Sequence, residues 1–405
     1  MADLQWGEAY IQLALRMERL FPGFVDGYYG PPALKAAVDA EAEPAAADLL
    51  RAAVALLESL SAQGYAPRRE AYLQKQVQAM VANCRKLTGE TLSLDDEVRL
   101  CFDIVPTWTP EAQFEEAVTL YEQGLPGHGS VTERLSRRRA GFELSGEQSR
   151  PLLVELMRKV TAEAQRRTLA FVDLPAGEAV EIATVTGEPW GAYNWYLGGY
   201  RSRIEFNVDL PTNVSSLIDT MAHEGYPGHH TEHVLKEQLL YRGQGYLENA
   251  ILLINTPECV ISEGIATLAA EMIFAPGEAR EWLSREIYPL AGIDAAAPGD
   301  NALLNRAADL LAGVRGNAVL MLHAEGRPRE EVVRYLMRYG LMPEDRARKA
   351  MAFLESPLWR AYTFTYFYGR RLMLPLLQGE DRLAVFRRLL TEQVYPSLLV
   401  EWAIR

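Results

Sequence analysis

Apolar side chains recur at helical spacing along most of the first 170 residues of this 405-residue chain. Phe114 and Tyr121, for example, would share one face of a helix. We expect that helix to begin with Thr109 as its N-cap and Pro110 as its first residue, because a proline there sacrifices no hydrogen bond. The pattern is again helical from Arg242 to the end of the chain, so the sequence predicts a mainly α protein.

One segment breaks this helical pattern. Between Val180 and Leu210 the chain is rich in glycine, aromatic and β-branched residues, which favour a short hairpin or a small sheet. Pro211 and Asn213 end this segment, and a new helix is expected to run from there into a histidine-rich stretch. We therefore expect a small β-sheet or hairpin beside the helix that carries the histidines.

Length and composition limit the class of protein. Apolar residues make up 49% and charged residues 23%, which is typical of a globular protein with a sizeable core. We expect a single large helical domain over residues 1–405, with two lobes, 1–172 and 173–405, as the alternative. The net charge of −13 argues against nucleic acid and against anionic membranes as partners. The oligomeric state is left open.

Three features bear on the compartment. Cys84, Cys101 and Cys259 are far apart and form no C-x-x-C pair, which is typical of free thiols in a reducing environment. The first residues are acidic and lack the basic and apolar regions of a signal peptide. No run of 18 apolar residues occurs, so no membrane-spanning helix is expected. These features predict a cytoplasmic protein.

The segment His223-Glu224-Gly225-Tyr226-Pro227-Gly228-His229-His230 carries the strongest chemical signal. The chain has only six histidines, and four of them lie between His223 and His233. A neutral imidazole is a good zinc ligand, and a glutamate beside it can act as general base towards a metal-bound water. The segment looks like the zinc-hydrolase pattern H-E-x-x-H with residues inserted before the second histidine.

The spacing of these histidines does not suit an unbroken helix. His229 would lie about 240° around the helix from His223, and His230 would lie roughly 10 Å further along its axis. Pro227 lacks an N–H group and its ring clashes with the carbonyl of residue 223, so the helix must kink or end there. We therefore expect a break over 225–228 that swings either His229 or His230 back beside His223.

A catalytic zinc site needs a third protein ligand. His128 and His323 are isolated and are expected to be ordinary histidines, so the ligand should be a carboxylate. Glu263 lies in an otherwise apolar helical stretch, where a charge is costly unless it is paired or binds a metal. Its segment resembles the Asn-Glu-Gly-Phe-Ala segment of zinc aminopeptidases. Glu271, two turns further on, is expected either to orient a histidine or to be a surface carboxylate.

Further residues could bind or polarise a substrate. Tyr366 and Arg370 share a helical face and could stabilise an oxyanion, whereas Tyr362 in the same aromatic run is expected in the core. Arg203 could bind a substrate carboxylate. The strand Arg203–Val208 could pair by its edge with an extended peptide.

These motifs together resemble a known family. His-Glu-x-x-Pro-Gly-His-His, followed some thirty residues later by Glu-Gly-x-Ala, resembles the bacterial family called domain of unknown function 885, which is grouped with the gluzincin metallopeptidases. The resemblance extends from about Gly191 to Arg371 and includes Arg203, Asn207 and the Tyr366-x-x-Gly369 segment. It implies a gluzincin-like helical shell around a cleft and a zinc-dependent hydrolase.

The resemblance also assigns roles to individual residues. It implies His223, His229 and Glu263 as zinc ligands and Glu224 as the general base. The expected function is therefore a zinc metallopeptidase that cleaves short peptides with a metal-activated water. Two alternatives remain, a metal-dependent hydrolase of non-peptide amides or esters and a catalytically silent metal-binding protein.

Overall fold

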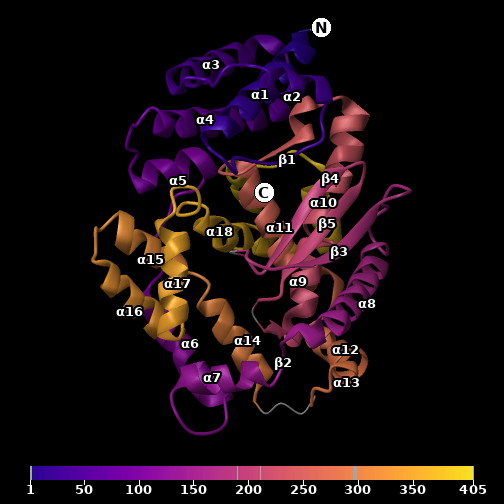
Figure 1. Cartoon of the computed structure of the whole chain (residues 1–405), viewed down its shortest axis with the longest axis vertical. Helices are drawn as coiled ribbons and strands as arrows, with labels where there is room; N and C mark the ends of the chain where they lie inside the picture. Colours follow the sequence, from indigo (N-terminus) through magenta and orange to yellow (C-terminus); the bar gives the residue numbers. More distant parts are fainter. Residues whose placement is uncertain (1, 189, 210, 295–298, 405) are drawn as a thin grey trace.

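The computed structural model describes residues 2–188, 190–209, 211–294 and 299–404. Helices dominate these residues, and the strands form sheets of only two or three members. The prediction of a mainly α protein with a small sheet is thus confirmed. Figure 1 shows the first helices of the chain gathered at one end of the molecule and the sheet along one side of its centre.

The helices form three groups around this centre (Figure 1). The N-terminal group consists of α1 (Ala2–Leu20), α2 (Pro32–Asp39), α3 (Ala46–Ser59), α4 (Pro67–Leu87) and α5 (Leu94–Phe102). The opposite end contains α6 (Glu111–Gly124), α7 (Val131–Ala140), α8 (Arg150–Thr168), α12 (Glu278–Glu286), α13 (Tyr288–Ala291) and α14 (Asn301–Leu310). A third group contains α15 (Val314–His323), α16 (Arg329–Tyr339) and α17 (Glu344–Glu355).

The central helices carry the residues that the sequence analysis singled out. They are α9 (Leu217–Glu224), α10 (His229–Lys236), α11 (Pro257–Ile273) and α18 (Thr363–Met373), followed by α19 (Arg382–Thr391) and α20 (Pro396–Ile404). Helix α11 packs against both α9 and α18. Residues nearly 150 positions apart in the sequence therefore meet in the middle of the fold.

The largest sheet lies beside α9 and α10. Its order is β3 (Ala179–Val185), β5 (Arg201–Asn207) and β4 (Ala192–Gly198), with β5 in the middle. Strands β4 and β5 form the expected hairpin, and β3 adds to β5 in parallel. A second, unpredicted pairing joins β1 (Val25–Tyr28) to β7 (Ile251–Leu253), and a third joins β2 (Glu143–Leu144) to β6 (Thr212–Asn213).

The hydrophobic clusters join residues from the two ranges that were considered as lobes. Five clusters of buried apolar residues occur in the described structure, and each combines residues from both sides of position 172. Trp6 and Leu247, for example, belong to one cluster, and Phe114 and Val319 belong to another. Buried apolar residues on the two sides of position 172 thus pack together in the described structure, and the division into domains stays a prediction.

The start of α6 differs from the sequence prediction by one residue. Pro110 is the N-cap and Glu111 is the first helical residue. The Thr109 N–H donates to the side chain of Asn317 instead of opening the helix. Thr109 is therefore held by a tertiary contact with α15 that helix-start rules do not include.

No single helix in the described ranges is long and apolar enough to cross a membrane. Helices α11 and α12 reach that length and apolar content only when joined, and they meet at a bend of 72°. Most of α11 is buried within the protein, which accounts for its apolar sequence.

Helices α11 and α18 touch through their backbones. Gly264 and Gly369 face each other at the crossing, and a Cβ atom at Gly369 would lie 2.4 Å from the Val260 carbonyl oxygen and 2.7 Å from the Cα of Gly264. Such distances leave no room for a methyl group. The two glycines therefore set the separation of the helices that carry Glu263 and Tyr366.

Gly369→Ala is expected to lower the free energy of unfolding by about 1–3 kcal/mol, because the added methyl group overpacks the α11–α18 crossing. On helix propensity alone the same change would stabilise the protein by up to about 1 kcal/mol. The sign of the change in the free energy of unfolding therefore distinguishes overpacking from helix propensity. Urea unfolding followed by circular dichroism measures it. Gly191→Ala is the control, because Gly191 has open space around its Cβ position. A stabilised Gly369→Ala variant would contradict the close crossing.

Candidate metal centre

The predicted helix break lies between α9 and α10. Helix α9 ends at Glu224 and α10 begins at His229, and the Tyr226–Pro227 peptide bond is cis. The Gly228 N–H donates to the Ala222 carbonyl (2.9 Å), so the chain folds back onto the last turn of α9. A Cβ at Gly228 would lie only 2.0 Å from the His223 carbonyl oxygen. The turn therefore requires glycine at this position.

The break brings His229 next to His223. Their ring centroids are 4.7 Å apart, and one ligand atom each of His223, Glu224 and His229 lies within 4.8 Å of the other two. Glu263 of α11 faces the same point, with its Oε2 atom 3.4 Å from His223 Nε2 and 4.0 Å from His229 Nε2. Two imidazoles and two carboxylates thus converge from three helices.

His230 is directed away from this point. Its Nδ1 atom lies 2.8 Å from the Ser202 hydroxyl and its Nε2 atom lies 2.8 Å from Glu178, so both ring nitrogens are occupied. The ring is fully buried, and Glu178 also accepts a hydrogen bond from Tyr226 within the break. The structure therefore distinguishes the two histidines, and His230 anchors the turn between α9 and α10.

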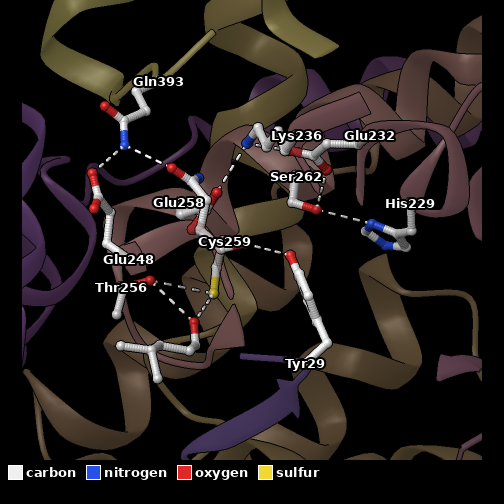
Figure 2. Close-up of polar contacts among 12 residues, drawn as sticks. Tyr29, His229, Glu232, Lys236, Glu248, Thr256, Glu258, Cys259, Ser262 and Gln393 are labelled. Atoms are coloured by element: carbon white, nitrogen blue, oxygen red, sulfur yellow. Dashed lines mark hydrogen bonds and ion pairs between the residues drawn. The ribbon is translucent and has the colours of Figure 1, made fainter. Parts of the chain in front are cut away.

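A buried polar network holds His229 in place (Figure 2). His229 Nδ1 lies 2.9 Å from the Ser262 hydroxyl, and this hydroxyl donates to Glu232 at 2.6 Å. Lys236 donates in turn to Glu232 (2.7 Å) and to Glu258 (2.9 Å). With Nδ1 fixed on this side, the Nε2 atom of His229 points to Glu263.

Glu263 is held by one of its two carboxylate oxygens. Tyr362 donates a hydrogen bond to Oε1 at 2.7 Å, whereas Oε2 is buried and has no hydrogen-bond partner among the described residues. Buried carboxylate oxygens without a donor are rare because desolvation is costly. Oε2 is also the oxygen that faces both histidines, which is the arrangement expected of a metal ligand.

The pKa values of the carboxylates Glu224 and Glu263 are shifted in opposite directions. Burial, together with the charges of Glu263 and Asp26, raises the pKa of Glu224 to about 7. Burial also opposes the charge of Glu263, but the nearby His223 and His229 outweigh it and lower the pKa of Glu263. Glu224 is thus suited to exchange a proton near neutral pH, and Glu263 to keep its negative charge.

The pKa values of the two histidines are likewise shifted in opposite directions. Burial disfavours the charged ring of His223, but Glu263 and Glu224 outweigh it and raise the pKa of His223 to about 9. Burial and the neighbouring His223 lower the pKa of His229 to about 3. The carboxylates therefore stabilise one positive charge at this point, where a metal cation would replace a proton.

These atoms line a cavity of about 130 Å³. Tyr366 of α18 lies at this cavity and is 40% exposed. Desolvation and the charges of Glu263 and Glu224 raise its pKa well above the usual value, so its hydroxyl keeps its proton. Asp26 of β1 and Tyr193 and Asn194 of β4 also line this cavity.

The predicted arginines lie outside the cavity. Arg203 is 44% exposed and pairs with its neighbour Glu205 on β5. Arg370 pairs with Glu271 and Asp309 on the surface. Neither arginine is among the residues that line the cavity. The sequence placed both on the correct elements, but the side chains project to other faces.

The structure decides between the two alternatives for Glu271 and corrects one expectation about the sheet. Glu271 is half-exposed and bound to Arg370, so it is the surface carboxylate of the two alternatives. Ser262 and Glu232 instead form the hydrogen-bonded chain that orients His229. Strand β5 is central in its sheet, so Arg203–Val208 has no free edge for a peptide. Strand β4 is an edge strand and lines the cavity.

Sequence reasoning missed several residues of the site. Tyr362 lies in the core as expected, but its hydrogen bond to Glu263 was not predicted. Asn194 donates to the backbone carbonyl of Glu224, and Asp26 accepts from Tyr193. Ser262 directly precedes Glu263 and could have been noticed as a buried hydroxyl on an apolar helix. Asp26 carried no signal, because β1 is a four-residue strand between helices.

The donor set fits a zinc ion. Two imidazole nitrogens and a carboxylate oxygen are ligands that zinc accepts, and catalytic zinc sites use three protein ligands. The unpartnered Oε2 of Glu263 supports this fit directly. His223, His229 and Glu263 are therefore the residues that would hold the ion.

Comparison with known proteins finds a similar fold but identifies no function. No protein-family model matches the chain, and no curated protein matches it. Among solved structures, the fold is similar to that of "the putative lipoprotein from Colwellia psychrerythraea", with 17% identity, a TM-score of 0.57, and coverage of 89% of this chain and 67% of that one. At this identity the likeness shows a shared fold alone. The family resemblance and the cytoplasmic location stay predictions.

Proposed function

We propose that this protein is a zinc-dependent hydrolase, most specifically a metallopeptidase that cleaves short peptides. The observation that supports the proposal is the convergence of His223, His229 and Glu263 on one point, with a second carboxylate of opposite pKa shift beside them. A purely structural cluster would not need one carboxylate tuned to hold charge and another tuned to exchange a proton.

A zinc ion held there would supply Lewis acidity, making a water molecule more acidic and polarising the substrate carbonyl. Glu224 accepts the proton that this water loses as its oxygen bonds to the carbonyl carbon. Glu224 then delivers the proton to the leaving nitrogen as the C–N bond breaks, so a carboxylic acid and an amine result. Its pKa of about 7 suits both transfers.

The neighbouring residues orient Glu224 and the substrate. Asn194 holds the backbone carbonyl of Glu224 and thereby fixes the end of α9. Tyr366 keeps its proton and lies at the same cavity, so its hydroxyl can donate to the oxyanion that develops on the carbonyl oxygen. Tyr366 is retained in the proposed machinery, whereas Arg203 and Arg370 are not.

The size of the cavity favours small substrates. About 130 Å³ is well below the roughly 300–1,000 Å³ of pockets for drug-sized ligands. The edge strand β4 lines this space through Ala192, Tyr193 and Asn194 and could pair with one short extended segment. We therefore favour short peptides over folded proteins as substrates. Amides and esters of similar size are the nearest alternative.

One observation favours a second candidate, a metal-binding protein without catalysis. Glu224 also lies within ligand range of the two histidines, and a fourth protein ligand would close the site. The two candidates differ in what Glu224 does, so a change at this residue separates them.

Glu224→Gln is expected to keep about one zinc ion per chain and to lose hydrolysis of a peptide library by about 100-fold or more, because the amide cannot accept a proton. Metal content is measured by mass spectrometry of the purified protein and cleavage by liquid chromatography. Glu271→Gln, a surface change on α11, is the control and should leave both unchanged. Loss of zinc from Glu224→Gln would favour the closed site. Wild-type protein without stoichiometric metal would refute the whole proposal.

Ser262→Ala is expected to weaken zinc binding by about 10- to 100-fold, because His229 loses the hydroxyl that orients its ring. Competition with a chromogenic chelator measures the affinity. Ser202→Ala is a matched control, since it removes the same kind of contact from His230, which does not face the cavity. Equal zinc affinities in the two variants would show that Ser262 does not position the ligand.

A further inference from the structure

The cavity has an unusual charge balance. Asp26, Glu224, Glu258 and Glu263 line it, and no lysine or arginine is among its described lining residues. Glu258 is neutralised by the buried Lys236 (Figure 2), and Glu263 faces the two histidines. Asp26 receives a hydrogen bond from the neutral Tyr193 hydroxyl and forms no ion pair in the described structure. Glu224 also has no ion pair among the described residues, but it is the proposed general base, so Asp26 is the carboxylate without a counter-ion that the proposed chemistry does not use.

A second group that lines the cavity has a carbonyl oxygen without a hydrogen-bond donor. Asn194 is only 6% exposed, and its Nδ2 atom donates to the Glu224 carbonyl. Its Oδ1 atom has no hydrogen-bond partner among the described residues. A buried acceptor left unsatisfied costs about 1–3 kcal/mol, so such groups usually mark a bound ligand or water. Asn194 follows Tyr193, the residue that holds Asp26, on β4, and all three residues line the cavity.

The Asp26 carboxylate and the Asn194 carbonyl oxygen are both suited to bind an ammonium group. An ammonium group carries a positive charge and three N–H donors, so it can serve a carboxylate and an amide oxygen together. A substrate carboxylate would find no lysine or arginine among the described residues that line this cavity. Asp26 and Glu224 both line this cavity of about 130 Å³, so a ligand bound at Asp26 lies close to Glu224.

We propose that Asp26 and Asn194 form a subsite for the protonated α-amino group of a peptide, which places the first peptide bond of the substrate at Glu224. This inference rests on the proposed function and names its substrate class, short peptides with a free amino terminus. A lysine side chain offers the same ammonium chemistry. The α-amino group is the better fit because it occupies less of a cavity of about 130 Å³ than a lysine side chain does.

Binding and turnover are tested with three peptides: Ala-Phe-Ala-amide, its N-acetyl form, and N-acetyl-Lys-Phe-Ala-amide. The zinc-loaded full-length protein should cleave the free peptide about 10- to 100-fold faster, in kcat/KM, than the acetylated one, the range for a hydrogen bond to a charged group. Asp26→Asn should remove most of this preference through KM, and Asp26→Glu should restore part of it. Asp309→Asn, an exposed change, is the control.

A second measurement does not depend on turnover. Calorimetric titration of Glu224→Gln with the free and acetylated peptides should show about 10-fold or more tighter binding of the free peptide, and the double variant with Asp26→Asn should not discriminate. If the Asp26 variants do not fold, the ratio of the affinities of Glu224→Gln for the free and acetylated peptides still tests whether the protein recognises a free amino group.

Each outcome separates the subsite from the proposed function. Equal binding and cleavage of free and acetylated peptides would refute the subsite and leave the hydrolase intact. Preference for the acetyl-lysyl peptide would refute the α-amino assignment. Selective binding without cleavage by zinc-loaded wild type would support the subsite and refute the peptidase.

Discussion

The close approach of Gly228 to the carbonyl groups of Ala222 and His223 is the constraint on which the rest of the site depends. Pro227 cannot continue α9, because it lacks an N–H group and its ring clashes with the preceding turn. Gly228 then lets the chain fold directly against that turn. Any side chain there would push α10 outward and carry His229 away from His223, so the tight turn and the convergence of ligands are one feature.

A second backbone contact completes the geometry. Gly264 and Gly369 meet where α11 crosses α18, with no room for a side chain between them. Glu263 directly precedes Gly264, and Tyr366 lies one turn before Gly369, so this crossing brings the ligand carboxylate and the tyrosine to the same cavity. The two Gly-containing motifs, about a hundred residues apart, are therefore the two halves of one contact.

Buried charge is distributed unevenly around these contacts. Glu232, Lys236 and Glu258 compensate one another under His229, and the histidines compensate Glu263. Charges buried without a partner are costly, so a fold that keeps one usually has a use for it. The Oε2 atom of Glu263, which has no hydrogen-bond partner among the described residues, and the carboxylate of Asp26, which forms no ion pair there, lie where we propose that the metal and the substrate amine bind.

The sequence by itself determined the mainly helical fold, the small sheet and the break at Pro227. It also determined that His223, Glu224 and Glu263 converge with either His229 or His230. These follow from local rules: helical periodicity, the missing N–H of proline, and the cost of a charge in an apolar helix. Only the tertiary structure decided between His229 and His230, turned Arg203, Arg370 and Glu271 outward, and brought Asp26 and Tyr362 to the site. Those outcomes depend on which distant elements pack together, and no spacing within one segment encodes that choice.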